Sequence, residues 1–228
     1  MHARLLPYGD GAVLVELDSL DDALALHGVL TGPRRPAGLS DAVLGARTVL
    51  LVAREPRFLP GLRTAAQAAV AQPPQSPHGD PDTAEPPPDP VRIPVRYDGP
   101  DLAQVCDLTG LSQDEVVAAH TATPWTVGFA GFAPGFAYLV GGDPRLRVPR
   151  RTTPRSTVPA GSVGLADEFS GIYPRDSPGG WQLVGTTDAQ LWSLDRNPPA
   201  LLRPRGVVWF TDVAAAPAGG QAAPEGGR

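Results

Sequence analysis

A proline-rich stretch divides the chain and constrains its fold more than any other feature of the sequence. Eight of the 19 positions from Gln72 to Pro90 are proline, and several of the others are acidic. Because proline fixes its own φ angle and lacks a backbone N–H donor, this stretch cannot pack a core and is expected to form an extended spacer. The sequence therefore predicts two folding units, residues 1–71 and 91–213, joined by a linker over residues 72–90.

The segment before the linker has the pattern of a small α+β unit of the βαβ-sandwich type. The run AVLVEL at residues 12–17 is typical of a strand. Behind Ser19, a helix-capping residue, apolar residues recur at the three-to-four spacing of an amphipathic helix. We expect helices over residues 19–31 and 59–71, and further strands over residues 43–44 and 48–52.

The segment after the linker changes to a β rhythm. From Pro124 onward, Gly and Pro recur every few residues between short runs rich in β-branched and aromatic residues, which predicts a barrel or a sandwich. Two helices are expected ahead of it, over residues 101–109 and from a capping box at Ser112 to about His120. Residues 214–228, mostly Ala, Gly and Pro, are expected to form a disordered tail. The expected strands cover residues 91–97, 125–129, 136–140, 162–165, 181–184, 190–194 and 207–210.

Composition excludes several chemistries. All 19 basic residues are arginine, so neither a Schiff-base lysine nor the lysine of a phosphate-binding P-loop is present. A single cysteine, Cys106, excludes an intrachain disulfide and a cysteine zinc site, and the four histidines are dispersed, so no metal site is expected. The net charge of −5 is unlike that of a nucleic-acid-binding domain. No apolar run has the length of a membrane span or of a signal peptide, so we expect a cytoplasmic protein without a membrane or nucleic-acid partner.

Two segments of the second unit have the residues of a binding pocket. Residues 131–139, GFAPGFAYL, combine glycines with three aromatic side chains; this indicates either chain wrapped around a pocket or a glycine-kinked barrel strand. Five arginines fall within eleven residues that contain no acid, which is typical of an anion cradle or of a solvated surface ribbon. These arginines are Arg145, Arg147, Arg150, Arg151 and Arg155.

Glycine-rich segments and one histidine add further candidates. Residues 158–164 and 177–181 place hydroxyl groups beside glycine backbone, which either forms an anion-binding nest or makes tight turns. His120 is the one histidine of the second unit, and its side chain either transfers protons or interacts with a helix end.

Together these segments resemble a known family. Residues 158–164 (VPAGSVG), 171–174 (GIYP) and 177–185 (SPGGWQLVG), preceded by His120 and residues 131–139, are similar to the KipI family, also called allophanate hydrolase subunit 1 or the 5-oxoprolinase B subunit. Residues 8–10 and 93–102 match the family as well, so the resemblance runs from about residue 5 to residue 213. It implies a small α/β-sandwich N-terminal domain followed by a cyclophilin-like β-barrel, an α+β protein.

The resemblance also implies a function. Such a chain is the B subunit of an ATP-dependent 5-oxoprolinase, a cyclic amide hydrolase that converts 5-oxo-L-proline to L-glutamate with partner A and C subunits, uses ATP with Mg²⁺, and is inactive alone. The alternative in the same family is a regulatory protein that binds and inhibits a sensor histidine kinase. Prolyl isomerase activity is a third possibility that rests on the barrel fold alone, and fold does not determine function.

Opening a lactam requires anion binding, oxyanion donors and an acid–base group. We assign these roles as follows: anion binding to Arg151 and Arg155, hydrogen-bond donation to Ser162, Ser177 and the backbone of Gly179 and Gly180, proton transfer to His120, and shaping of the pocket to Tyr138 and Tyr173. The chain departs from the family in two places. Asp167-Glu-Phe-Ser170 replaces Gly-Gly-Gln-Thr, and Gly185-Thr-Thr187 replaces Gly-Arg-Thr, so a glutamine amide and an arginine are lost and we expect altered ligand contacts with the fold retained.

Overall fold

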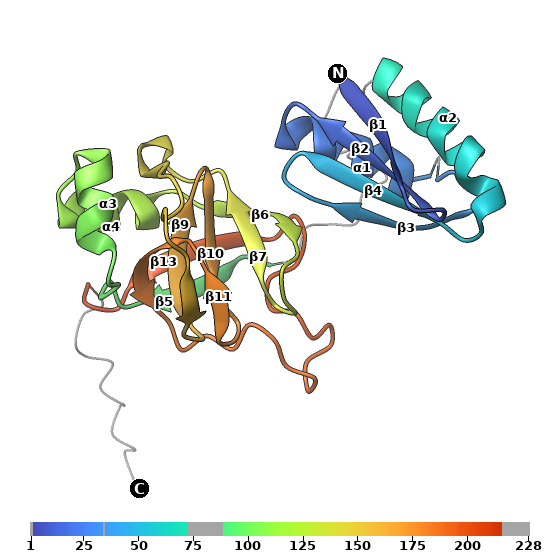
Figure 1. Ribbon diagram of the computed structural model, residues 1–228. Helices are drawn as coiled ribbons and strands as arrows, with labels where there is room; N and C mark the ends of the chain where they lie inside the picture. The colour runs from blue at the N-terminus through green and yellow to red at the C-terminus, as the bar shows by residue number, and fades with distance from the viewer. Residues whose placement is uncertain (1, 34, 73–88, 216–228) are drawn as a thin grey trace, which may run out of the picture. The chain divides into compact units, whose positions relative to one another are not determined.

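The computed structural model describes residues 2–33, 35–72 and 89–215 (Figure 1). Most of the expected linker and the expected tail lie outside the described residues, so the statements made about them stay predictions. The chain divides into two compact units. The first holds the described residues up to Gln72 together with Gly128–Gly131, and the second holds the other described residues from Asp89 on.

The first unit is a four-stranded antiparallel sheet with two helices. The sheet has the order β1-β2-β4-β3. Because β2 and β3 both run antiparallel to β4, they are parallel to each other, and the helix α1 that joins them completes a split βαβ unit. The elements are β1 (Ala3–Tyr8), β2 (Ala12–Leu17), α1 (Leu20–Thr31), β3 (Leu39–Leu44), β4 (Thr48–Ala53), the short 3-10 helix η1 (Pro56–Phe58) and α2 (Leu59–Ala71).

The second unit is built on a seven-stranded sheet with the order β12-β9-β10-β7-β6-β13-β5. Its two outer strands meet: Arg96, next to β5, exchanges two backbone hydrogen bonds of 2.9 and 2.8 Å with Thr186 of β12. The sheet therefore closes almost completely into a barrel, which removes its free edges. The strands are β5 (Val91–Val95), β6 (Trp125–Ala130), β7 (Ala137–Val140), β9 (Ser162–Ala166), β10 (Phe169–Ile172), β12 (Gln182–Thr186) and β13 (Val207–Asp212).

Three helices and a separate ribbon complete the second unit. The helices are α3 (Leu102–Thr109), α4 (Gln113–Ala122) and the short 3-10 helix η2 (Pro144–Leu146). Gly110 ends α3 with a φ of 72°, and Ser112 and Glu115 form the expected capping box of α4. The strands β8 (Arg155–Val158) and β11 (Ser177–Gly179) pair only with each other within the described sheets. No helix of the described residues is both long and apolar enough to span a membrane.

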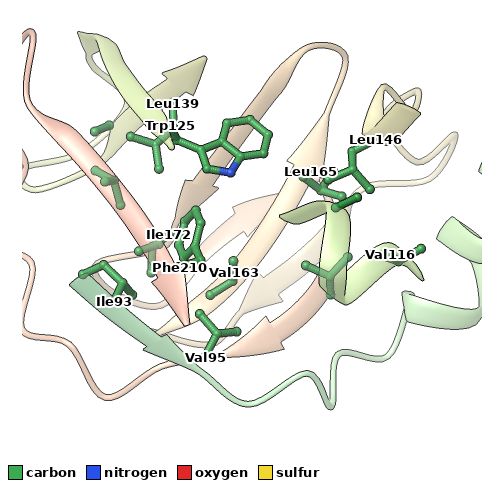
Figure 2. Close-up of a cluster of buried hydrophobic side chains, with 14 of the residues drawn as sticks. Ile93, Val95, Val116, Trp125, Leu139, Leu146, Val163, Leu165, Ile172 and Phe210 are labelled. Atoms are coloured by element: carbon green, nitrogen blue, oxygen red, sulfur yellow. The ribbon is translucent and has the colours of Figure 1, made fainter. Parts of the chain in front are cut away.

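The barrel core is filled by one side of its strands (Figure 2). Val163 and Leu165 of β9 point into the buried core, as do Leu139 of β7 and Ile172 of β10, and the core also holds the rings of Trp125 and Phe210. Since successive side chains of a strand point to opposite faces, the residues between them face outward. The outward side of these same strands carries the candidate site.

One expected strand is absent. Residues 190–194 form no strand and make only an isolated bridge between Trp192 and Ala200. The guanidinium of Arg196 donates to the carbonyls of Pro199 and Gln190, at 3.3 and 3.0 Å, and these bonds hold the segment as a loop. The composition of the segment favoured a strand, but its hydrogen bonds run within the loop.

Candidate functional site

Aromatic side chains gather on the outer face of the barrel. The ring of Trp181 lies edge-on to Phe136, Tyr138 and Tyr173, with centroids 5.4, 5.6 and 6.5 Å away. Gly171 makes room for this cluster, because a Cβ there would lie 2.9 Å from the Trp181 ring. The glycine pattern of the sequence therefore does serve close packing of aromatic rings.

The β8–β11 ribbon lies against this aromatic face. Gly179 of β11 pairs with Arg155 of β8, and a Cβ at Gly179 would overlap the hydroxyl oxygen of Tyr173. The backbone N–H of Arg151 donates to the carbonyl of Gly180 at 2.7 Å. The structure thus brings together Tyr173 with Arg151, Arg155 and the two glycines.

Two arginines share one buried carboxylate. Arg151 Nη1 and Arg155 Nη2 each donate to Oδ1 of Asp101 at 2.7 Å, and Oδ2 of Asp101 accepts from the backbone N–H of Leu183 at 2.7 Å. Asp101 is only 3% exposed, whereas the side chains of Arg151 and Arg155 are 32% and 23% exposed. The carboxylate therefore anchors two arginine side chains that remain partly exposed to solvent.

The arginine cluster is less positive than its sequence indicates. Each of the five arginines has a carboxylate within 4.0 Å, supplied in four cases by an acid remote in the sequence. Only the pair Arg151 and Arg155 has two cations for one carboxylate, which leaves one net positive charge (2 − 1 = 1). Of the five arginines that were expected to bind an anion, Arg151 and Arg155 are therefore the remaining candidates.

Two nitrogens of this pair have no hydrogen-bond partner among the described residues. They are Arg151 Nε and Arg155 Nη1, and both atoms are buried. A buried donor left unpaired costs about 1–3 kcal/mol, so native structures rarely retain one without a reason. The pair can donate these two N–H groups to the oxygens of an anionic ligand.

Burial and neighbouring charges in the site shift the pKa values of Asp101, Tyr138 and Tyr173. Burial alone would raise the pKa of Asp101, but the hydrogen bonds from Arg155 and Leu183 and the nearby positive charges lower it below its usual value. Burial raises the pKa of Tyr138 and of Tyr173, and the nearby Arg150 guanidinium partly opposes both shifts. At neutral pH the site therefore presents an ionised carboxylate and neutral phenol groups.

His120 does not take part in this site. Its side chain is fully buried, stacks on Phe210 at 4.2 Å between ring centroids, and has both ring nitrogens engaged, Nδ1 with the Tyr97 hydroxyl at 2.7 Å and Nε2 with the Ser170 hydroxyl at 2.9 Å. Burial lowers the pKa of His120 to about 3. A neutral, enclosed imidazole cannot exchange protons with a substrate, so the assignment of proton transfer to His120 is corrected to a packing role.

The two serines are also constrained. The hydroxyl of Ser177 donates to the carbonyl of Arg175 at 3.0 Å, which occupies the proton it was expected to offer. Ser162 lies on β9, where it is 3% exposed and pairs with Thr186. The Ser177 hydroxyl is therefore occupied within the protein, and the Ser162 side chain is almost fully buried.

The backbone N–H groups of the expected nest at residues 158–164 donate to acceptors within the protein. The backbone N–H of Ala160 donates to Oδ1 of Asp176 at 2.9 Å, and that of Gly161 donates to the carbonyl of Tyr173 at 2.7 Å. The N–H of Ser162 donates to the carbonyl of Pro159 at 3.2 Å. These contacts make a tight turn, which was the alternative interpretation of that segment.

Asp101 is the site residue that sequence reasoning missed. It stands at the start of α3, where an acid is typical of an ordinary helix cap, but its side chain makes no capping hydrogen bond. A useful signal was present in the arginine cluster, since partly buried guanidinium groups require a carboxylate. The sequence alone does not show which of the 24 acidic residues supplies it.

The positions that depart from the family pattern have structural roles. Asp167 has a φ of 52°, a left-handed conformation that glycine adopts more readily than other residues. The hydroxyl of Thr186 donates to Asp98 at 2.9 Å, beside the bridge that closes the barrel. Among the described residues, no group of three His, Cys, Asp or Glu side chains could hold a metal ion.

Known proteins resemble this chain in sequence and in fold. The family model "Carboxyltransferase domain, subdomain C and D" matches residues 3–202. The 5-oxoprolinase B subunit of Bacillus subtilis is 45% identical over 127 residues, which cover 54% of this chain and 53% of the relative. The chain thus spans about half the length of the curated relatives that it matches.

Solved structures share the architecture. The crystal structure of TTHA0988 superposes with a TM-score of 0.68 at 34% identity and covers 94% of this chain but 41% of its own. The urea amidolyase of Kluyveromyces lactis, at 19% identity, shares the fold alone, with a TM-score of 0.69 over 92% of this chain and 15% of its own. Because the family model covers most of the sequence, the chain belongs to the family of the carboxyltransferase domain, subdomains C and D, and the resemblance found in the sequence to the 5-oxoprolinase B subunit is confirmed.

Proposed function

We propose that the chain is the B subunit of an ATP-dependent 5-oxoprolinase, which hydrolyses 5-oxo-L-proline to L-glutamate together with homologues of the A and C subunits. The observation that carries this proposal is the 45% identity to a 5-oxoprolinase B subunit over 127 residues. No observation favours the kinase-binding alternative. The proposal includes the two-domain description, with a small α/β sandwich followed by a cyclophilin-like barrel, and action in the cytoplasm.

The reaction needs activation because a lactam is stabilised by amide resonance. In the proposed sequence, the lactam oxygen takes the γ-phosphoryl group of ATP, which leaves ADP. Water then attacks the activated ring carbon, and the C–N bond breaks with its electron pair going to nitrogen, which leaves an acyl phosphate of glutamate. A second water molecule cleaves this acyl phosphate into a carboxylate and inorganic phosphate. The products are glutamate, ADP and phosphate, and two water molecules are consumed, so the atoms balance.

The residues of this chain fit the binding part of that reaction. Arg151 and Arg155 offer two unpaired N–H groups to an anionic oxygen, and a guanidinium suits a carboxylate. Tyr138 is the partly exposed ring of the aromatic cluster, since Tyr173 and Trp181 are only 2% and 3% exposed, and its ring suits the apolar edge of a small ligand. Gly179 and Gly180 lie between the arginine pair and the aromatic cluster, since Gly179 contacts Tyr173 and pairs with Arg155, and Gly180 accepts a hydrogen bond from Arg151.

Other parts of the machinery are assigned to partner subunits. The sequence contains no lysine and therefore no P-loop, and the described residues form no metal cluster. ATP and its Mg²⁺ are thus proposed to bind at a site that a partner completes. With His120 enclosed, an acid–base group is likewise proposed to come from a partner.

Reconstitution tests the proposal. The chain is purified alone and with homologues of the A and C subunits, and glutamate released from 5-oxo-L-proline is measured with and without ATP. We expect ATP-dependent release by the complex and none by the chain alone. A stoichiometric complex without turnover, combined with tight binding of this chain to a histidine-kinase dimerisation domain, would establish the regulatory alternative instead.

A further inference from the structure

We propose that Asp101 determines ligand specificity, by setting the preference of the Arg151–Arg155 pair for a singly charged carboxylate over a doubly charged phosphate. This inference rests on the proposed function, since it states which chemical group of the reactants this chain binds. Asp101 acts through the two arginines and is a positioning residue.

The first step is that Asp101 fixes both guanidinium groups. Its Oδ1 accepts from Arg151 and from Arg155, each at 2.7 Å, while its Oδ2 is held by the backbone N–H of Leu183. The backbone N–H of Asp101 also donates to the carbonyl of Leu183 at 3.0 Å. The carboxylate is thereby attached to β12, and it holds both guanidinium groups in place by one hydrogen bond each.

The second step is the charge that a ligand meets. Two guanidinium groups and one carboxylate give a net charge of one positive unit. The neighbouring Arg150, whose guanidinium lies 5.9 Å from the Trp181 ring centroid, is itself balanced by Asp167 at 4.0 Å. A monoanion neutralises the site, whereas a dianion leaves an excess negative charge in partly buried surroundings.

The third step is the set of donors that remains. Arg151 Nε and Arg155 Nη1 are buried and unpaired among the described residues, and they sit on guanidinium groups anchored to the same oxygen atom. A carboxylate offers two oxygens to such donors. The carboxylate of 5-oxo-L-proline matches both the charge and the donors, whereas the terminal phosphate of ATP, with about two negative charges at neutral pH, does not match the charge.

A series of three charge states tests the inference in the full chain assembled with its partner subunits. Arg151→Met removes one cation (net 0), the wild type has net +1, and Asp101→Asn removes the anion (net +2). The probes are 5-oxo-L-proline, 2-pyrrolidone as the lactam without a carboxylate, and inorganic phosphate at pH 8, where it carries about two charges. Calorimetry gives the dissociation constant of each probe.

We expect the wild type to bind 5-oxo-L-proline more tightly than phosphate or 2-pyrrolidone. Asp101→Asn should shift the ratio of the two anion affinities toward phosphate by about ten-fold. One added positive charge at the site improves the electrostatic binding energy of a dianion twice as much as that of a monoanion. Arg151→Met should weaken both anions and leave 2-pyrrolidone unchanged. The surface variant Asp143→Asn removes a carboxylate paired with Arg145 alone and should change no ratio.

Three results would overturn the inference: wild type that binds neither anion, an equal affinity for 5-oxo-L-proline and 2-pyrrolidone, or an affinity ratio that does not follow the charge series. Circular dichroism checks each variant, and if Asp101→Asn does not fold, Arg151→Met against the wild type decides. The proposed function is judged separately by glutamate release from the wild-type complex, so the two failures are distinguishable.

Discussion

The Nε2 atom of His120 on α4 lies 2.9 Å from the hydroxyl oxygen of Ser170 on β10. This hydrogen bond joins a helix to the barrel wall from the inside, and Trp125 adds a second link by donating its indole N–H to the carbonyl of His120 at 3.1 Å. The imidazole is therefore a structural element of the barrel core.

The first prediction concerns pH. The pKa of His120 is about 3 in the folded protein against 6.5 when unfolded, so the unfolded state binds a proton that the folded state does not. The contribution of His120 to stability is complete above about pH 6.5 and is lost as the pH falls toward 3. We expect urea unfolding at pH 7.5 and pH 5 to show lower stability at pH 5.

The variant His120→Gln isolates this effect. It should be less stable than the wild type at pH 7.5 by about 2–4 kcal/mol, because buried packing and hydrogen bonds are lost. Its stability should also change less between pH 7.5 and pH 5. An identical pH dependence in both proteins would show that His120 is not the group responsible.

The second prediction compares two neighbouring glycines. In Gly179→Ala the new methyl group meets the Tyr173 hydroxyl, whereas in Gly180→Ala the nearest atoms, in Pro154, are 3.7 Å away. Gly179→Ala should lower the free energy of unfolding by about 1–3 kcal/mol, the usual cost of overpacking. Gly180→Ala should change it by less than about 0.5 kcal/mol. Denaturant unfolding of both variants checks this, and equal losses would refute the packing described for Tyr173.

The architecture could be predicted well because it depends on local patterns. The helix over residues 59–71 and the capping box at Ser112 were found from apolar spacing and capping residues, and both are confirmed. The strands β1, β8, β10 and β11 were missed, and the last three are only three or four residues long. Such short strands are defined by their partners, which a single sequence does not reveal.

The candidate site could be predicted only in part, for a physical reason. Gly179 was singled out from a glycine-rich segment and Tyr173 from the family resemblance, and they lie together beside Arg155. The enclosure of His120 and the pairing of Asp101 with two arginines depend on contacts between residues about 50 positions apart. Their chemistry is set by burial and by charge partners, which become visible only when the chain is folded.

The third prediction concerns Ser177. Because its hydroxyl donates to the carbonyl of Arg175, removal of the oxygen should cost about 1 kcal/mol of stability and leave the reaction nearly intact. We expect the kcat of the reconstituted complex with Ser177→Ala to stay within about three-fold of the wild type. A hundred-fold loss with an unchanged melting temperature would return Ser177 to the reacting groups.

The fourth prediction concerns Arg155. Arg155→Leu removes one cation and one unpaired donor but leaves Asp101 paired with Arg151, so the barrel should still fold. Arg145→Leu is the matched control, since Arg145 is an exposed arginine that pairs with Asp143. We expect Arg145→Leu to leave turnover unchanged.

The most direct measurement is therefore the rate of ATP-dependent glutamate release from 5-oxo-L-proline by the reconstituted complex carrying wild-type chain, Arg155→Leu or Arg145→Leu. We predict turnover for the wild type and the control, and a loss of at least about a hundred-fold for Arg155→Leu with its melting temperature preserved. Equal turnover in all three complexes would contradict the assignment of the Arg151–Arg155 pair to the substrate site.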